Sequence, residues 1–438
     1  MWAQNEWVPA RWRAGLDPAR LRSGPVNCLV VDWPATGEDT VRRLRAAGFA
    51  VVGDLGSAPG TPHAAEGTRA TGLDALMGAP GSAGDSLVPA APVSSLPRTG
   101  PWQIAVVREG VWPGVRAGAH GASDAGPTGA PWIDSNGWAA RLARALAPGK
   151  TIWLDFAPPA GAAPSPDNWL LALCDAQAHG ARWILPAAAL DTPAWAVLSA
   201  ALAFFQAHRG WPSEAVSSVG TISAFSGAGE FLAQEFLNLS ARRQLPVRIL
   251  PADRAISALW YGLETLVYPD QAPPPPALLA RMLATVEAGA LLVAPPALAP
   301  LLHGRDAGEP PCPGYRMLAI GKGRAAVALQ PWDDPFLLAA DVQNLAGRRN
   351  APVRLWNPGA TMVFPTGETP ARTRLVHLVK YASRGGDPLT LGLTGRYRAA
   401  ALYTPGAAPV RLAPQAVRRG VEFPLPRFGV YGAVLLEG

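Results

Sequence analysis

The sequence predicts a multidomain α/β protein: a TIM-like (β/α) barrel, then a doubly wound α/β domain of flavodoxin type, then a small all-β sandwich. First, short apolar runs alternate with helical patterns over residues 1–213. Second, closely spaced strand–helix repeats fill most of 214–345. Third, residues 346–438 hold strand patterns without helices between them. With 438 residues, the chain is long enough for each domain to bury a core.

The barrel prediction starts from a βαβ unit. NCLVVDW (27–33) is a continuous apolar run that ends in an acid, EDTVRRLRAAG (38–48) has helical periodicity, and FAVVGDL (49–55) is the next strand. Seven strands fit a barrel better than a dinucleotide-binding fold, because no GxGxxG follows the first strand. Further strands are expected at 73–80, 86–97, 104–109, 151–159 and 181–189, and helices at 138–149, 168–180 and 193–210.

The middle domain is predicted from repeated strand–helix pairs, which indicate a parallel sheet with helices on its faces. A hairpin follows, turning at Gly321 to Gly323. The last domain alternates short strands with Gly and Pro, which is typical of a sandwich. The middle strands are expected at 217–225, 246–251, 264–269 and 290–297, its helices at 229–244, 254–262 and 278–289, and the sandwich strands at 353–357, 372–383, 388–395, 397–405, 421–429 and 431–438.

The charge of the chain is unevenly distributed. The net charge is +6, and 346–438 holds 13 Arg and Lys against 4 Asp and Glu. A basic domain can meet nucleic acid, and such binding would weaken steeply with salt. No nucleic-acid motif accompanies these arginines, which are scattered over a strand-rich segment. We therefore expect no nucleic-acid partner, and the arginine bias with the Ala and Pro excess favours a high-GC bacterial source.

The three cysteines, Cys28, Cys174 and Cys312, form no CxxC or Cys/His cluster. We expect neither a metal site nor a cofactor. No run of about 18 apolar residues suggests a membrane span. The first residues contain no apolar signal core, so the chain is expected to be cytoplasmic, or periplasmic or secreted if a leader was removed.

Two apolar strands of the predicted barrel each end in an acid, IAVVRE at Glu109 and TIWLD at Asp155. Glycoside hydrolysis uses two carboxyl groups about 5–9.5 Å apart, and neighbouring strands lie about 4.8 Å apart. If these strands are neighbours, Glu109 and Asp155 form a candidate catalytic pair, one as the acid and the other as the nucleophile or base. Arg108 is expected to face the other way unless the strand has ended. Otherwise both acids cap strands, or bind helix N-termini or arginines.

Four polar residues are candidates for substrate contacts. Asp32 and Asp54 end the first two strands, where they line the same mouth or pair with an arginine. Asp134 and Asn136 lie in the loop WIDSNGW. Asp134 also suits a helix N-cap, and Asn136 could hydrogen-bond a sugar hydroxyl.

Two tryptophans are candidate platforms for sugar rings, whose C–H faces pack on indole. Trp112 and Trp132 lie beside proline-rich loops. Tryptophan is also a common core residue with a large apolar surface, and Trp153, Trp169, Trp183 and Trp195 lie inside strands or helices. We predict that those four belong to the core.

The domain order resembles that of the microbial three-domain β-galactosidases and related glycoside hydrolases. The resemblance covers about half the chain and rests on VGTISAFSG, FLAQEFLNLSARR, AGALLVAPPA, the GKGRAAV hairpin, and the ending RLVHLVKYAS, LTLGLTGRYRAAALYTP and EFPLPRFGVYGAVLLE. It implies a middle domain similar to class I glutamine amidotransferases without their activity. In that family the middle domain often makes oligomer contacts, so the resemblance also implies a homo-oligomer.

The sequence departs from the pattern of that family. The β-galactosidases carry an Asn–Glu pair after the fourth strand and a second Glu after the seventh, and neither stands in the matching place, since ARWILPAAA ends in alanines. An amidotransferase would need a cysteine after ALLVA, where this chain has Pro295 and Pro296. The first hypothesis is therefore a glycoside hydrolase that acts on an oligo- or polysaccharide through paired carboxylates. The second is a non-catalytic carbohydrate-binding or scaffold protein with the same architecture.

Overall fold

The computed structural model describes most of the chain, in two compact units that are treated separately. The first unit contains Met1–Arg116 and Ile133–Gly210, and the second contains Ala117–Trp132 and Trp211–Gly438. The expected domain boundaries at 213/214 and 345/346 stay predictions. The described residues are 3–22, 24–33, 35–56, 72–80, 87–118, 124, 131–256, 260–347, 351–369, 372–382 and 388–437.

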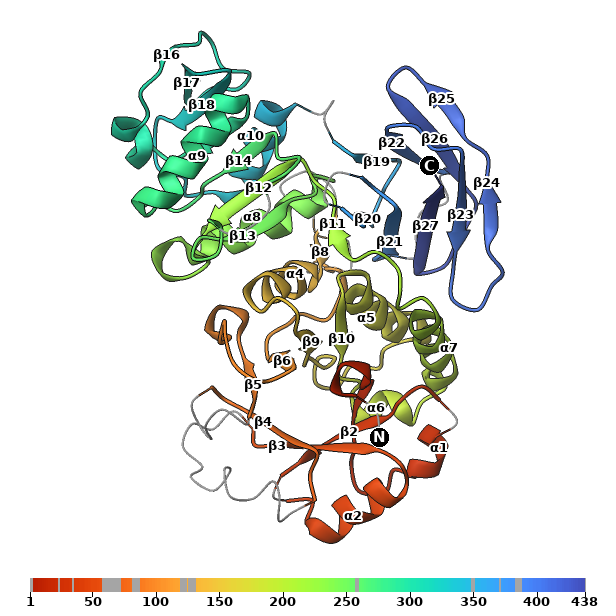
Figure 1. Cartoon of the computed structure of the whole chain (residues 1–438). Coiled ribbons are helices and arrows are strands. Elements are labelled where there is room, and N and C mark those ends of the chain that lie inside the picture. The colour runs from red at the N-terminus through yellow and green to blue at the C-terminus, as the bar shows by residue number, and fades with distance from the viewer. Residues whose placement is uncertain are drawn as a thin grey trace. The chain divides into compact units, whose positions relative to one another are not determined.

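The first unit is an eight-stranded parallel (β/α) barrel, which confirms the predicted fold (Figure 1). Leu185, just after the last strand, pairs in parallel with Ala10 of the first strand. Arg11 N–H donates to Leu185 O at 2.8 Å, and Leu185 N–H donates to Pro9 O at 3.1 Å, so the sheet closes on itself. In spatial order the strands are β1 (Pro9–Arg11), β2 (Cys28–Asp32), β3 (Ala50–Asp54), β4 (Ala75–Gly78), β5 (Val88–Ala91), β6 (Ile104–Val107), β9 (Thr151–Leu154) and β10 (Ala181–Trp183).

Strand β1 is the one barrel strand that the sequence analysis missed. Its three residues, Pro9 to Arg11, are too few to show a period, and they lie in a segment without a long apolar run. The two weakly indicated strands are present as β4 and β5. The barrel therefore has eight strands where seven were expected, and the additional strand carries Arg11.

The barrel interior is a packed core. Trp7 and Trp153 lie 6.4 Å apart between ring centroids and are both buried. Side chains of residues paired in parallel strands point to the same face of the sheet. Cys28 is paired with Ala50 and Val30 with Val52, and all four belong to the interior cluster, so they face the axis. The other residues of this cluster are Ala75, Met77, Val88, Ala90, Ile104, Val106 and Ile184.

Helices surround the barrel. Helix α5 begins with a capping box, in which Ser165 N–H donates to Asn168 Oδ1 at 3.2 Å and Asn168 N–H donates to Ser165 Oγ at 3.3 Å. The elements around the barrel are α1 (Pro18–Arg22), α2 (Glu38–Ala46), α4 (Gly137–Leu146), α5 (Pro166–Ala178), α6 (Ala187–Leu190) and α7 (Ala194–Ala207), the 3₁₀ turns η1 (Gln4–Glu6) and η3 (Val93–Ser95), and the hairpin β7 (Gly114–Val115) and β8 (Ile133–Asp134).

The second unit begins with an α/β sheet whose parallel strands follow the flavodoxin order. Strands β13, β12, β14, β15 and β18 lie side by side, and β17 and β16 extend the sheet antiparallel. The elements are β12 (Val219–Ser223), β13 (Arg248–Pro251), β14 (Thr265–Val267), β15 (Leu291–Ala294), β16 (Arg305–Asp306), β17 (Tyr315–Ile320), β18 (Gly323–Ala328), α8 (Glu230–Arg242), α9 (Pro276–Ala288), α10 (Pro335–Ala346), η4 (Gly227–Gly229) and η5 (Pro296–Leu301).

One expected helix of this sheet is wrong. In 254–262 the described residues form turns, and 257–259 lie outside the described residues. Trp260 Nε1–H donates to Ala255 O at 2.8 Å. Helix α10 was not expected, although Asp334 caps it by accepting from Phe336 N–H at 2.7 Å and Pro335 begins it.

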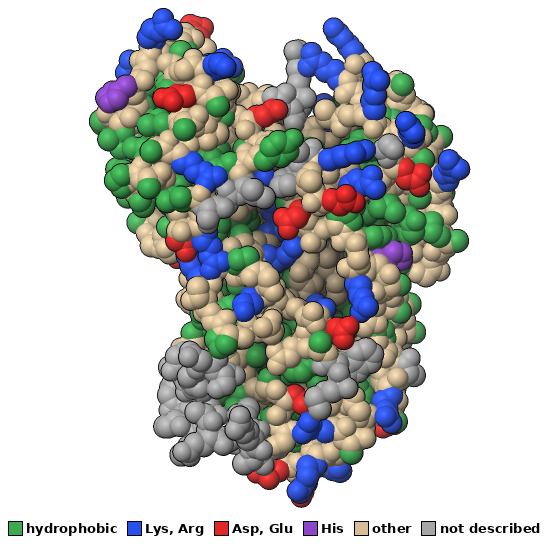
Figure 2. Space-filling model, viewed as in Figure 1, with side chains coloured by type: hydrophobic (Ala, Val, Ile, Leu, Met, Phe, Trp, Pro, Cys, Tyr) green, Lys and Arg blue, Asp and Glu red, His purple; other side chains and the backbone are tan. Residues whose placement is uncertain are grey.

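The same unit ends in a β-sandwich, as predicted. Its two antiparallel sheets enclose an apolar core that includes Leu391, Val376 and Phe423. Figure 2 shows Lys and Arg side chains gathered at the upper right, over the sandwich strands of Figure 1. One sheet contains β11 (Glu214–Ala215), β20 (Thr361–Gly367), β21 (Leu375–Lys380), β27 (Tyr431–Glu437), β23 (Ala399–Tyr403) and β24 (Val410–Leu412), and the other β19 (Val353–Trp356), β22 (Leu389–Thr394), β26 (Gly420–Leu425) and β25 (Gln415–Val417).

Candidate functional site

A cluster of charged side chains lies at the carboxyl ends of the barrel strands. Arg11 pairs with Val30 across β1 and β2, and Asp32 pairs with Asp54 across β2 and β3. Val30 faces the barrel axis, so Arg11 opposite it also faces the axis, and Asp32 and Asp54 do so one layer nearer the mouth. The members of this mouth cluster are Arg11, Asp32, Asp54, Arg108 and Asp155.

Arg11 lies at the centre of the mouth cluster. Its Nη2 is 2.6 Å from Asp155 Oδ2 and its Nε is 3.3 Å from Asp155 Oδ1. The same Nη2 is 3.0 Å from Asp54 Oδ2. A guanidinium group that bonds both oxygens of a carboxylate fixes that carboxylate in orientation as well as in place. Arg11 thus joins the ends of β3 and β9 from the end of β1.

Arg108 closes the cluster on its other side. It hydrogen-bonds Asp54 Oδ1, and its Nε lies 3.9 Å from Asp155 Oδ2. Asp32 is the outermost acid, with a side chain 83% exposed and an oxygen 3.9 Å from Arg11 Nη1. The Asp54 side chain is only 6% exposed. The buried part of the cluster therefore holds two cations and two anions in mutual contact.

The electrostatics of Arg11 follow from this arrangement. Burial on its own lowers the pKa of a guanidinium group, because it removes water from the charged form. The attraction of Asp155 and Asp54 and their hydrogen bonds outweigh that effect, so the pKa of Arg11 is raised above its ordinary value. Arg11 is therefore a cation at neutral pH.

The two predicted catalytic acids follow neighbouring strands. Strands β6 and β9 pair in parallel, with Val107 opposite Leu154, so Glu109 and Asp155 both lie just beyond one edge of the sheet. Glu109 Oε1 accepts a hydrogen bond from Val93 N–H at 2.7 Å. Arg108 was expected to face the other way unless the strand had ended. Strand β6 does end at Val107, and Arg108 bonds Asp54 and approaches Asp155. The pairing of Glu109 with Asp155 in catalysis stays a prediction.

Trp112 packs among other aromatic rings. Its centroid lies 5.2 Å from that of Trp169 and 5.9 Å from that of Trp183, both edge to face. Phe156 stacks on Trp183 at 5.1 Å. Trp183 on β10 lies opposite Leu154 on β9. Because the preceding residue, Trp153, faces the barrel axis, Leu154 and Trp183 face outward. The aromatic cluster therefore lies between the barrel wall and α5. The cluster accounts for the partial burial of Trp112 without a ligand.

The remaining predicted contact residues have protein partners. Arg116 holds Asp134 at two points, 2.6 and 3.1 Å. The Asn136 amide bonds the backbone of Val111, accepting at 2.9 Å and donating at 3.0 Å. Trp132 belongs to the second unit, where the Arg242 guanidinium carbon lies 4.3 Å from its ring centroid. A role for these residues in substrate binding stays a prediction.

A buried polar cluster supports the loop that leads into α4. Asp175 accepts from Ser135 Oγ–H at 2.7 Å and from Asn136 N–H at 2.8 Å. His179 Nδ1 lies 2.8 Å from Asp175 O, and its ring packs against Gly137. Burial lowers the pKa of His179, although Asp175 acts in the opposite sense. These hydrogen bonds hold the loop that leads into α4.

Sequence reasoning found three members of the mouth cluster, Asp32, Asp54 and Asp155, and missed Arg11 and Arg108 as site residues. The available signal was alternation, because each arginine lies two residues after an axis-facing position, Pro9 or Val106.

Among the described residues, no group of three or more His, Cys, Asp and Glu could hold a metal ion. No helix in the described part of the chain is both long and apolar enough to span a membrane.

No protein-family model matches the sequence, and no curated protein matches it. Solved structures that resemble it include several glycoside hydrolases. They include α-L-fucosidase isoenzyme 2 from Paenibacillus thiaminolyticus (TM-score 0.49, 14% identity, 91% of this chain and 71% of that chain) and a β-galactosidase from Bacillus circulans sp. alkalophilus (0.48, 11%, 91% and 65%). A β-galactosidase from Halorubrum lacusprofundi has a TM-score of 0.44 with 14% identity, covering 92% of this chain and 66% of that chain. The chain spans slightly under two thirds of the length of both β-galactosidases.

Proposed function

We propose that this protein binds carbohydrate at the mouth of its barrel without hydrolysing it. The observation that carries the proposal is the two-point bond from Arg11 to Asp155, together with its bond to Asp54. Hydrolysis needs one carboxyl group that gives a proton and another that acts as nucleophile or base. Asp54 and Asp155 are instead held as partners of arginines, so neither is placed as a free acid.

The mouth cluster has the chemistry of a sugar site. A hydroxyl group both donates and accepts hydrogen bonds, so it can accept from a guanidinium N–H while it donates to a neighbouring carboxylate oxygen. Arg11 and Asp155 offer such a pair, with side chains 29% and 15% exposed. Asp32 adds an exposed acceptor beside them. The ligand class is therefore a neutral oligo- or polysaccharide, whose hydroxyl groups match alternating donors and acceptors.

Hydrolysis by Glu109 and Asp155 is the second candidate. It is favoured by one observation, the direct pairing of β6 with β9. Acids that follow neighbouring strands can meet the spacing of about 5–9.5 Å that glycoside hydrolases use.

A glycan array followed by product analysis tests both candidates. Our proposal expects glycan binding by the full chain, no new reducing ends on prolonged incubation, and weakened binding by Arg11→Gln and Asp32→Asn. Arg13→Gln is the matched control, because Arg13 forms an exposed ion pair with Asp191 in the same unit. Product release that both Glu109→Gln and Asp155→Asn abolish would establish the second candidate. Absence of both binding and product would reject both.

A further inference from the structure

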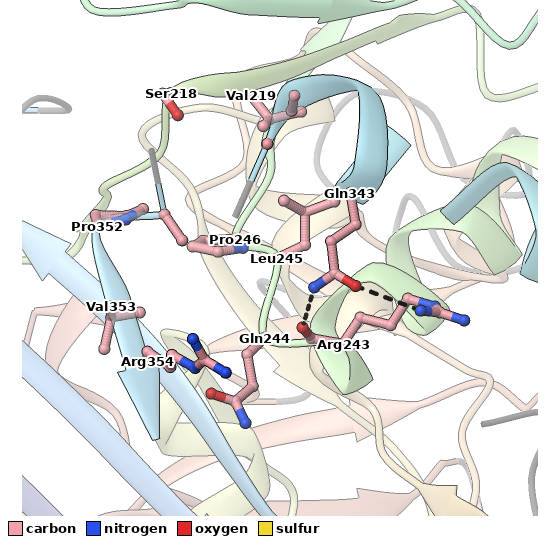
Figure 3. A pocket seen from close by; sticks show the side chains of 13 residues that line it. Ser218, Val219, Arg243, Gln244, Leu245, Pro246, Gln343, Pro352, Val353 and Arg354 are labelled. Carbon is pink, nitrogen blue, oxygen red and sulfur yellow. Dashed lines mark hydrogen bonds between the residues drawn. The ribbon is translucent and has the colours of Figure 1, made fainter. Parts of the chain in front are cut away.

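A cavity of about 340 Å³ lies within the second unit, apart from the barrel. Its walls come from the end of α8 and the loop after it, from α10, and from the start of β19 (Figure 3). Leu245, Pro246, Pro352 and Val353 supply apolar surface. This volume is at the lower end of the range for ligand sites, about 300–1,000 Å³. The cavity therefore suits a molecule of roughly monosaccharide size.

Arg354 is held rigidly on one side of the cavity. Its guanidinium carbon lies 3.6 Å from the centroid of the Trp356 ring, on the same strand face. The Trp356 indole is itself fixed, because its Nε1–H donates to Glu422 Oε1 at 3.0 Å. Stacking uses the flat face of a guanidinium group and leaves the N–H bonds at its edge to donate. Arg354 thus presents an oriented cationic edge.

Arg243 is held in a similar way at the C-terminal cap of α8. Its guanidinium carbon lies 4.5 Å from the Phe336 ring centroid, and its Nη1 donates to Gln343 Oε1 at 3.3 Å. Gln343 Nε2–H donates in turn to Arg243 O at 2.9 Å, as Figure 3 shows. Burial raises the pKa of Asp341, and the nearby charge of Arg243 acts in the opposite sense. Both arginines that line the cavity are therefore stacked on aromatic rings.

Gln244 joins the two walls of the cavity at a conformational cost. Its φ is +56°, in the left-handed region where glycine usually ends a helix. Its side chain accepts from Leu355 N–H at 2.6 Å and donates to Leu355 O at 3.0 Å, as a neighbouring strand would. This tie keeps β19, and with it Arg354, beside the end of α8.

We propose that this cavity binds a small organic anion, a molecule of about monosaccharide size with a carboxylate or phosphate group. Two stacked arginines line it, and none of its described lining residues is acidic. Guanidinium edges bind carboxylate and phosphate oxygens through paired, charge-assisted hydrogen bonds. The apolar walls cover the uncharged part of the ligand. The inference goes beyond the proposed barrel function and uses none of its residues.

Isothermal titration calorimetry on the full chain tests this site with D-glucuronate, D-glucose 6-phosphate and D-glucose. We expect one or both anions to bind and neutral glucose not to bind. The anion that binds identifies the charged group that the site prefers. We expect Arg354→Gln to weaken binding about tenfold to hundredfold, because it removes hydrogen bonds to a charged group. We expect Trp356→Leu to weaken it about two- to fivefold through the lost stacking.

Arg411→Gln is the matched control, since it removes an exposed arginine of the same sandwich on β24, outside the cavity. It should bind the anion as the wild type does. Circular dichroism checks that each variant is folded. The proposal is overturned if neither anion binds at millimolar concentration, if glucose binds equally well, or if Arg354→Gln and Arg411→Gln have the same affinity.

Discussion

Arg11 and Asp155 are 144 positions apart in the chain and form a two-point ion pair, with Nη2 2.6 Å from Oδ2 and Nε 3.3 Å from Oδ1. The pair joins the first strand of the barrel to the seventh, β9, across the mouth. It makes Asp155 the partner of a cation. The stability and the chemistry of the mouth therefore depend on the same contact.

Replacement of Arg11 by leucine should destabilise the barrel. The variant leaves Asp54 and Asp155 with Arg108 alone, and breaking a partly buried pair costs about 2–3 kcal/mol, between the exposed and buried cases. Differential scanning calorimetry, which separates the transitions of the two units, measures the loss. The double variant Arg11→Leu with Asp155→Leu should recover part of it, because no uncompensated charge then remains at Asp155.

The control for this prediction is Arg13→Leu. Arg13 lies two residues further along and pairs with Asp191, with side chains 60% and 35% exposed. An exposed pair contributes about 0–1 kcal/mol. Equal losses for Arg11→Leu and Arg13→Leu would show that the mouth cluster does not stabilise the fold.

Gly137→Ala should destabilise the loop that leads into α4. A Cβ at Gly137 would lie 2.5 Å from His179 Cε1 and Nε2, and His179 is buried. Overpacking of this kind costs about 1–3 kcal/mol. Gly210→Ala is the matched control, because a Cβ there meets nothing within 4 Å. A melting temperature of Gly137→Ala equal to that of Gly210→Ala would contradict the packing argument.

His179 should make the stability of the first unit depend on pH. Burial lowers the pKa of His179 below its ordinary value of 6.5 in the folded state. The unfolded chain then binds a proton at a higher pH than the folded chain, so stability falls with decreasing pH from about 6.5 down to the folded pKa. Above about 6.5 this contribution to stability is fully present.

The measurement is calorimetry of the wild type and of His179→Asn from pH 7.5 to pH 5, values chosen to bracket the pKa of about 6.5 for an unperturbed histidine. Asparagine does not titrate, so the variant should lack this part of the pH dependence, although it is less stable throughout. Parallel stability curves for the two proteins would mean that His179 binds its proton equally well in both states.

Gln244→Gly should lower the stability of the second unit. Glycine removes the cost of a positive φ, which is about 1 kcal/mol. It also removes both hydrogen bonds to Leu355, which we expect to outweigh that gain. Asn357→Gly is the comparison, since Asn357 has the same φ of +56° but makes one exposed hydrogen bond, to Pro388 O. A Gln244→Gly variant as stable as Asn357→Gly would show that the tie to β19 contributes little.

The sequence determined the order and class of the domains, because local apolar periodicity reports strands and helices. It placed β2, β3, β6 and β9, and it also placed Asp32, Asp54 and Asp155 at the strand ends. It missed β1 because three residues show no period, and it expected a helix at 254–262, where residues 254–256 and 261–262 form turns. The local sequence pattern therefore predicts an element where that element is long enough for its apolar period to repeat.

Only the tertiary structure decided what surrounds each acid. Closure of the barrel brings β1 beside β10, and it thereby carries Arg11 to Asp155. The end of β6 at Val107 frees Arg108 to bond Asp54. These contacts join residues far apart in the chain, so no local pattern encodes them. They join Asp54 and Asp155 to two arginines in one network of ion pairs, and Arg11 reaches Asp155 only because the sheet has closed.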